Sequence, residues 1–339
     1  MSSQKILTSQ RILGYDLSRT FAVIFVFVAH IILAQWDNKY STIFFTSFSP
    51  GVTMSLLGFV SACLLANSES VDNKFSHFLF RRITRIYLPM ILCLTFAAIL
   101  AKSLGTSIQS DHLIYHYLGA ALFFDWLKVP NNASVGWGLW FVTAILIMYV
   151  LLPVLKLAFK HRNGRLHFIL FYILCVTINI VSVPPESSFW NVAVSFGFGV
   201  YLASNGLLSK VLNLKLVWAV PLAILLLFIC SLCSAGIIHF DIRKLLFPLY
   251  PIAFMPIFFS LASRISGLLE KSISKFSEIS FEFYMLQFYF INGGFTKIFG
   301  GQFHLVWQIV IGFCAALLVS ILLAEIGKRL RRAADNYFL

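Results

Sequence analysis

The sequence LVWAVPLAILLLFICSLCSAGII, residues Leu216–Ile238, runs for 23 residues without a charged side chain. At about 1.5 Å of rise per residue, a helix of this length spans the roughly 30 Å hydrocarbon core of a bilayer. A helix that is apolar on every face is typical of a membrane span or of the core of a large protein. This stretch therefore predicts a transmembrane helix.

The rest of the chain has a similar composition. Of its 339 residues, 59% are hydrophobic and 12% are charged, and the mean hydropathy is +0.87. Soluble domains carry about 25% charged residues, so too little polar surface is present here to cover a soluble domain. Intrinsic disorder, collagen and small disulfide scaffolds are excluded. The predicted fold class is an all-α membrane protein.

Apolar runs near the length of one span recur ten times, which predicts a polytopic bundle of about ten transmembrane helices. We divide the chain into an N-terminal tail at 1–14, a transmembrane domain at 15–326 and a basic C-terminal tail at 327–339, with both tails cytoplasmic. The approximate runs are Leu17–Ala34, Pro50–Ala66, Ile86–Ala101, Gly136–Leu157, His167–Val183, Phe189–Ala203, Leu216–Ile238, Leu245–Ala262, Ile279–Asn292 and Leu305–Ile326.

The net charge of +13 comes from 26 Lys and Arg against 13 Asp and Glu. In a soluble protein this excess would indicate a nucleic-acid partner. With a cytoplasmic N-terminus, however, all but six of the basic residues fall on the cytoplasmic side, as the positive-inside rule predicts for an even number of spans. The charge then reflects topology and contact with lipid headgroups, and no nucleic-acid partner is expected. The six exceptions are Lys39, Lys102, Lys128, Arg243, Lys244 and Lys297.

The segment from Asp111 to Lys128 is apolar but interrupted by charged and histidine side chains. An additional span there would reverse the orientation of all later helices and place the basic C-terminal segment outside. We therefore predict an interfacial or re-entrant helix on the outer side.

Ionisable groups inside a span cost about 3 kcal/mol or more and are candidates for function. The first span carries Asp16, Arg19 and His30. Asp16 and Arg19 are three residues apart and share a helix face, whereas His30 lies about 16 Å along the helix from Arg19. The alternatives are a snorkelling topogenic charge for Arg19 and a histidine hydrogen-bonded to a neighbouring helix for His30.

Two further patterns are candidates for binding. Arg82 and Arg85 share one helix face at the start of the third span, and guanidinium groups suit phosphate, including the diphosphate of a nucleotide-bearing cofactor. Anchoring by positive charge is the alternative. In the ninth span, Ser280, Tyr284 and Gln287 form a polar stripe that faces inward.

The chain resembles the acyltransferase-3 family of membrane acyltransferases. Asp16-Leu17-Ser18-Arg19 with His30 is similar to the family pattern Asp-x-x-Arg-x(10)-His, and Arg82-Ile83-Thr84-Arg85 before Pro89 is similar to its Arg-x-x-Arg motif. The fourth span resembles the branch with Leu-Trp-Phe and a terminal Leu-Leu-Pro, here Leu139-Trp140-Phe141 and Leu151-Leu152-Pro153.

The stretch Ile279-Ser280-Phe281-Glu282-Phe283-Tyr284-Met285-Leu286-Gln287 resembles the family's late Ile-Ser-Tyr-x-x-Tyr-Leu-x-His. Gln287 replaces the common histidine, so no general-base role is assigned there. The resemblance spans nearly the whole chain and looks like the stand-alone form, without the extracytoplasmic domain of some members.

The resemblance implies transfer of an acyl group, most often acetyl, from acyl-CoA to a hydroxyl of a cell-surface polysaccharide or lipid-linked sugar. Acetyl-CoA is then a co-substrate, and neither a tightly bound cofactor nor a metal is expected. Arg82, Arg85 and Arg19 would hold the CoA phosphates, and Asp16 would orient Arg19. His30 would act as general base, with an acyl-histidine intermediate as an open alternative. The expected acceptor-site residues are Trp140, Ser280, Tyr284 and Gln287.

The resemblance also places the protein in the cytoplasmic (inner) membrane of a bacterium. The alternative function is a transporter or flippase of a lipid-linked saccharide, with Arg19 and His30 lining the pathway. Transfer or hydrolysis of acetyl-CoA by the purified protein distinguishes the two.

Overall fold

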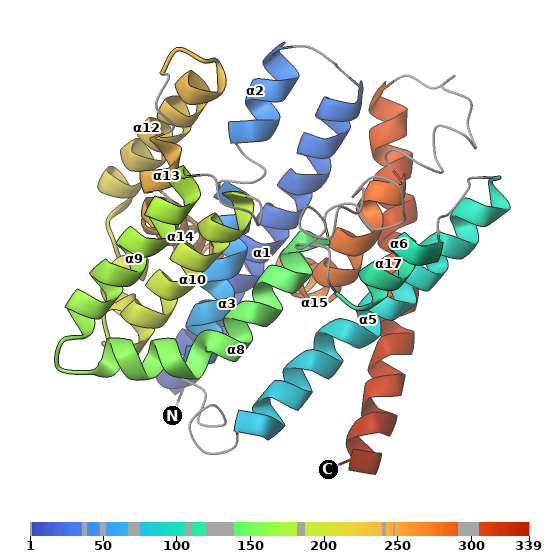
Figure 1. Cartoon of the computed structure of the whole chain (residues 1–339), viewed down its shortest axis with the longest axis horizontal. Coiled ribbons are helices and arrows are strands. Elements are labelled where there is room, and N and C mark those ends of the chain that lie inside the picture. The colour runs from blue at the N-terminus through green and yellow to red at the C-terminus, as the bar shows by residue number, and fades with distance from the viewer. Residues whose placement is uncertain are drawn as a thin grey trace.

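The computed structural model describes residues 2–35, 39–47, 52–66, 75–105, 110–119, 139–181, 187–238, 242–246, 248–290 and 305–338. Every regular element in these ranges is a helix (Figure 1), which confirms the predicted all-α class. The helices are α1 (Ser2–Gln35), α2 (Lys39–Ser47), α3 (Met54–Ala66), α5 (Phe75–Ser103), α6 (Ser110–Tyr117), α8 (Trp140–Lys160), α9 (Gly164–Ile180), α10 (Ser187–Ser204), α11 (Leu208–Leu212), α12 (Leu216–Ser234), α13 (Arg243–Leu246), α14 (Leu249–Ala262), α15 (Leu268–Phe288) and α17 (Leu305–Phe338).

The described residues of the ten predicted apolar runs lie mostly in helices, and the run Leu245–Ala262 is divided between α13 and α14. Within the described ranges, five helical segments are long and apolar enough to cross a membrane, and they lie in α1, α5, α8, α12 and α17. The shorter apolar helices are α3, α9, α14 and most of α10. These features support an integral membrane protein, while the ten-span topology and the cytoplasmic placement of both tails remain predictions.

The outward faces of the helices are apolar. Val154 and Leu157 on α8, Trp218 on α12 and Leu318 on α17 are all well exposed. Several serine, asparagine and glutamine side chains lie inside instead, as Ser195 on α10 does with no exposed surface. An apolar exterior around a partly polar interior is the arrangement that a bilayer favours.

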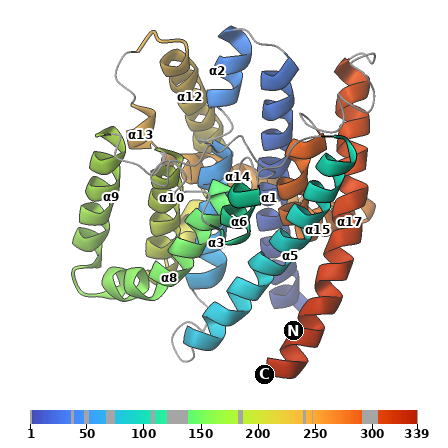
Figure 2. The same cartoon turned by 45° about the vertical axis from the view of Figure 1, so that its right-hand side comes forward.

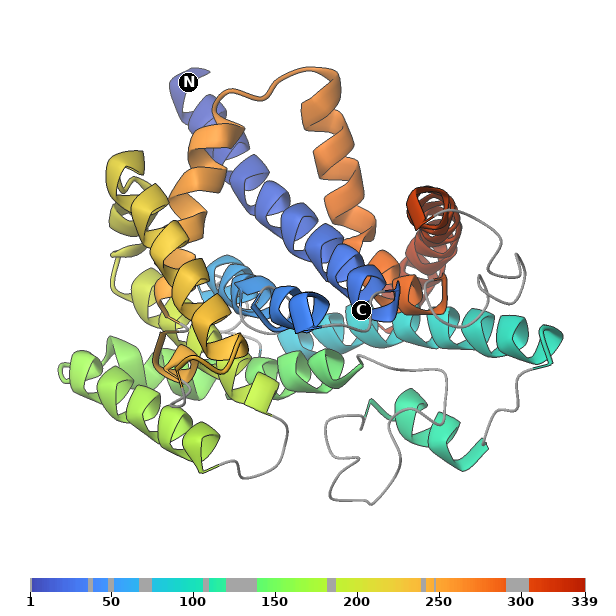
Figure 3. The ribbon, with the colours of Figure 1, turned by 90° about the horizontal axis from the view of Figure 1, so that it is seen from above.

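Helix α1 runs through the middle of the bundle, where it packs against α3, α14 and α15. On one side of it, α10 packs against α3, α8 and α9, and α12 packs against α14. On the other side, α15 and α5 pack against α17 (Figures 1 and 3). The space between these two groups holds the candidate site.

Helix α6 folds back along α5. The Tyr117 hydroxyl lies 2.8 Å from the Thr95 hydroxyl, and the Tyr87 hydroxyl donates to the Leu118 carbonyl at 2.9 Å. Tyr87 lies near the middle of α5, so the end of α6 lies alongside the middle of that helix. The interfacial or re-entrant character of this segment stays a prediction, and residues 120–128 lie outside the described ranges.

The start of α1 and the end of α17 lie at the same end of the bundle (Figures 1 and 2). The segment predicted as a basic tail, 327–339, continues α17 in helical form as far as Phe338. The start of α5 contributes further cations here. We call this the basic end, and we define it by Arg81, Arg82, Arg85, Lys328, Arg331 and Arg332.

Candidate functional site

A cavity of about 370 Å³ opens at the basic end, between α1, α3, α5, α8, α15 and α17. We call it the inner pocket. Its lining includes six of the nine predicted site residues, although they come from three helices that are distant in sequence. These six are Asp16, Arg19, Arg82, Arg85, Ser280 and Tyr284.

Helical spacing explains how each helix presents its polar groups. Asp16 and Arg19 on α1, like Arg82 and Arg85 on α5, are three residues apart and therefore project from one face. On α15, the buried Ser280 and Tyr284 are separated by four residues. Three local patterns thus converge on one cavity because α1 packs against α15 and α15 packs against α5.

Ser277 of α15 joins the two charged groups of α1. Its hydroxyl donates to Asp16 Oδ1 at 2.7 Å and accepts from Arg19 at 3.4 Å. Arg19 and Asp16 themselves form an ion pair at 3.6 Å. This network holds the Arg19 guanidinium at the pocket wall and ties α1 to α15 at the same point.

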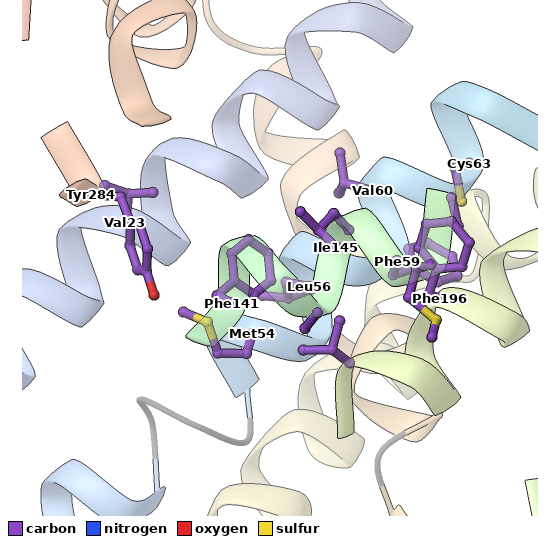
Figure 4. Packing of buried hydrophobic residues seen from close by; sticks show 14 of the residues in the cluster. Val23, Met54, Leu56, Phe59, Val60, Cys63, Phe141, Ile145, Phe196 and Tyr284 are labelled. Atoms are coloured by element: carbon purple, nitrogen blue, oxygen red, sulfur yellow. The ribbon is translucent and has the colours of Figure 1, made fainter. Parts of the chain in front are cut away.

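Part of the lining is apolar or aromatic. Val23 of α1, Phe141 and Ile145 of α8, and Tyr284 of α15 line the inner pocket, and Figure 4 labels these side chains among the packed residues of the bundle. The rings of Phe141 and Tyr284 meet edge to face, with centroids 5.8 Å apart and an interplanar angle of 66°. The pocket therefore offers both charged and apolar contacts, which suits an amphipathic ligand.

The two glutamates of α15 differ in their surroundings. Glu278 is 60% exposed and forms an ion pair with Lys328 at 2.9 Å. Glu282 is 3% exposed, lines the inner pocket, and has no ion-pair partner within 4 Å among the described residues. The cations that act on it electrostatically are Arg331, Lys328 and Arg85. A buried carboxylate of this kind is a candidate functional group.

A second cavity of about 510 Å³ adjoins the first and is almost entirely cationic. We call it the outer pocket. It shares Arg82, Arg85 and Arg331 with the inner pocket. Guanidinium groups bind phosphate oxygens through paired hydrogen bonds, so the shared wall is suited to phosphate. The outer pocket is lined by Arg81, Arg82, Thr84, Arg85, Lys328, Arg331 and Arg332.

His30 lies further along α1 and does not line the inner pocket. Its Nδ1 atom lies 2.8 Å from the carbonyl oxygen of Val26. A carbonyl oxygen only accepts hydrogen bonds, so Nδ1 carries the hydrogen. In the neutral ring, Nε2 is then the unprotonated nitrogen, which is the form that a general base requires.

Trp140 and Gln287 also lie outside the inner pocket lining. Trp140 is partly buried and packs edge to face on Phe141, with centroids 6.0 Å apart. Gln287 is 2% exposed, and its Oε1 atom has no hydrogen-bond partner among the described residues. It continues the inward polar face of α15 beyond Tyr284.

Ser277, Glu282 and Arg331 were not predicted as site residues. Ser277 has a sequence signal, because it shares a helix face with Ser280 and Tyr284 at i, i+3 and i+7. Glu282 falls two residues after Ser280, which gives no hint of a shared pocket. Arg331 is more than 240 residues from Arg85, and only the packing of α17 against α5 brings the two to one cavity.

A family model described as an acyltransferase domain matches residues 12–325. No curated protein and no solved structure matches the chain. The matched range contains all nine predicted site residues, together with Ser277 and Glu282. It ends before the three cations that α17 contributes to the outer pocket.

Proposed function

Because the chain belongs to the acyltransferase-3 family, whose activity is acyl transfer in the membrane, we propose that it moves an acetyl group from acetyl-CoA to a hydroxyl of a cell-surface polysaccharide or lipid-linked sugar. One observation carries the donor assignment. Arginines from α1 and α5 line a cavity whose lining also includes apolar side chains, as an acyl-CoA with a charged end and a long neutral arm requires.

In this proposal, Arg82 and Arg85 bind the diphosphate of CoA, and Arg19 binds on its inward side. Arg19, Arg82 and Arg85 are close enough to act on one another electrostatically. An anion placed among them relieves this repulsion. Asp16 and Ser277 fix the direction of Arg19 through the network described above.

The reach of the donor supports His30 as the reacting group. The pantetheine arm is a chain of about twelve bonds, which extends on the order of 15 Å at peptide-like spacing. His30 lies about 16 Å along α1 from Arg19. Phosphates held at the arginines therefore allow the thioester to approach the depth of His30.

The proposed chemistry follows from the tautomer of His30. Nε2 takes the proton of the acceptor hydroxyl while the hydroxyl oxygen attacks the thioester carbonyl carbon. The C–S bond then breaks, and CoA leaves as the thiol with the proton returned by the imidazolium. In the alternative route, Nε2 attacks the thioester carbonyl carbon, the C–S bond breaks and CoA leaves as the thiolate. The acceptor hydroxyl then attacks the acyl group on His30, which releases the imidazole, and its proton passes to the thiolate. Trp140, Ser280, Tyr284 and Gln287 are the proposed acceptor-side residues.

Two statements concern localisation, namely that the protein lies in a membrane and which membrane this is. The long apolar helices and the family membership indicate an integral membrane protein. We further propose that the basic end faces the cytoplasm of a bacterium, where acyl-CoA is made, because basic residues concentrate on that side. The acceptor then approaches from the opposite side or from within the bilayer.

Binding of acetyl-CoA to the purified protein tests the donor assignment. The double variant Arg82→Gln and Arg85→Gln should weaken binding by more than about tenfold, as expected for lost hydrogen bonds to a charged ligand. The double variant Arg162→Gln and Arg165→Gln removes the same charge from exposed positions in the turn before α9 and at the start of α9, and should have no effect. Equal losses in both variants would contradict the assignment.

Activity is tested separately by mass spectrometry of surface glycans from a strain that lacks the gene, which identifies acyl group and acceptor together. Loss of an O-acetyl group supports the proposal. A protein that neither binds acetyl-CoA nor transfers or hydrolyses its acetyl group would instead favour a transporter of a lipid-linked saccharide.

A further inference from the structure

The outer pocket contains more positive charge than one diphosphate requires. Six cations converge on it, three from the start of α5 and three from the last turns of α17, and no carboxylate is part of its described lining. Lys328 is paired with Glu278 at its edge. Among the described residues, Arg81, Arg82, Arg85 and Arg332 have no ion-pair partner.

The positive-inside rule does not by itself explain this convergence. That rule requires basic residues on one side of the membrane, and exposed side chains spread around the helix ends satisfy it. Here the two groups come from helices more than 240 residues apart and line one hollow. Like charges that line one hollow repel, and a bound anion offsets this repulsion.

The two pockets differ in the charge of their lining, and this difference determines which part of the ligand each pocket favours. The inner pocket contains Asp16, Glu278 and Glu282 besides its arginines, so its charge is mixed. The outer pocket is lined only by cations and Thr84, whose hydroxyl donates to backbone carbonyls of its own helix. A phosphate monoester, which carries close to two negative charges near neutral pH, is therefore favoured in the outer pocket.

We propose that the outer pocket is a second phosphate subsite, in which Arg331 and Arg332 of α17 recognise the phosphate monoester on the ribose of the donor nucleotide. This rests on the proposed function, since it assumes that the diphosphate binds Arg82 and Arg85, two of the three residues that the pockets share. It also predicts the class of donor. Coenzyme A carries this monoester, whereas an acyl carrier protein presents the same pantetheine arm on a single phosphodiester.

Phosphate monoesters also occur on a lipid headgroup, phosphatidic acid, and the pocket opens at the end of the bundle where headgroups lie. The chemistry of recognition is the same for both sources. A test must therefore compare soluble ligands that differ only in the monoester, and must do so with and without this lipid.

The test uses the full-length protein in phosphatidylcholine nanodiscs and isothermal titration with CoA and with 3′-dephospho-CoA. The wild type should bind CoA at least about tenfold more tightly than 3′-dephospho-CoA. The double variant Arg331→Gln and Arg332→Gln should reduce this ratio to within twofold of one, with affinity for 3′-dephospho-CoA changed by less than about threefold. Arg329→Gln is the matched control on the same helix, because Arg329 is exposed and paired with Glu325 outside both pockets.

The possible failures are distinguishable. If the wild type binds both ligands equally, or if the double variant keeps the wild-type ratio, the subsite is refuted while the proposed function stands. If neither ligand binds, the result contradicts the proposed function itself, on which the subsite depends. If adding phosphatidic acid to the nanodiscs abolishes the preference of the wild type for CoA and the double variant retains phosphatidic acid less well, the pocket is a headgroup site and the inference is wrong.

Discussion

Replacing Ser277 with alanine removes the hydroxyl that connects Asp16 and Arg19 across the α1 and α15 interface. The hydroxyl makes two hydrogen bonds, at 2.7 Å to the carboxylate and at 3.4 Å from the guanidinium. A hydrogen bond to a charged group contributes about 1.5 to 3 kcal/mol, and the second bond is long enough to contribute little. The first bond therefore sets the size of the effect.

Two features reduce the expected loss. The side chains of Arg19 and Asp16 are 31% and 15% exposed, so solvent screens their charges in part. Their ion pair at 3.6 Å can also shorten once the hydroxyl is gone. We expect a net cost of about 1 to 2 kcal/mol in the placement of Arg19. This cost corresponds to a change of roughly 5- to 30-fold in an equilibrium constant.

This cost should appear in the KM for acetyl-CoA, with kcat changed by less than about threefold. Arg19 is proposed to hold phosphates that do not change during the reaction, and such uniform binding alters KM alone. Ser272→Ala is the control, because Ser272 lies exposed on the same helix and, within the described part of the chain, its hydroxyl bonds only to the Leu268 carbonyl. If Ser277→Ala leaves KM within twofold of the wild type, Ser277 does not position Arg19 and the reasoning is refuted.

Three further predictions concern other parts of the site. His30→Asn should lower acetyl transfer by about 10² to 10⁴ while CoA binding is unchanged, as expected for loss of a general base; full activity in a transfer assay would exclude that role. Glu282→Gln should tighten CoA binding about two- to fivefold, because a negative charge leaves the pocket, whereas the exposed Glu278→Gln should change it less; calorimetry compares the two. Gly119→Ala should lower the thermal stability in detergent more than Gly105→Ala does. Both glycines have φ near +70°, but an added Cβ at Gly119 would lie 2.9 Å from the Tyr87 hydroxyl, whereas none of the described atoms lies within 4 Å at Gly105. Equal losses of stability in the two variants would contradict this prediction.

The membrane class and the local parts of the site were predictable from sequence. The length and apolarity of Leu216–Ile238 require a helix in a bilayer. Asp16 with Arg19, and Arg82 with Arg85, are pairs whose spacing fixes a shared face as soon as the helix forms. These predictions succeed because a helix is a local structure, and its periodicity determines which side chains are neighbours on its surface.

The two glutamates of α15 differ in a way that helix periodicity alone does not predict. The sequence offers no reason to distinguish Glu278 from Glu282. In the structure, one is exposed and paired with Lys328, and the other is buried at the inner pocket. The difference depends on which face of α15 meets α1 and α5, and nothing within α15 decides that.

The sequence by itself determined that this protein is a helical membrane bundle and that arginines lie at one end of it. Only the tertiary structure decided that Ser277 links Asp16 to Arg19 and that α5 and α17 form one cationic pocket. The physical reason is that a membrane helix has an apolar surface toward lipid and toward its neighbours alike, so hydrophobicity does not select its partners. Partner choice depends on the fit of small and polar groups between helices, and these contacts join residues hundreds of positions apart.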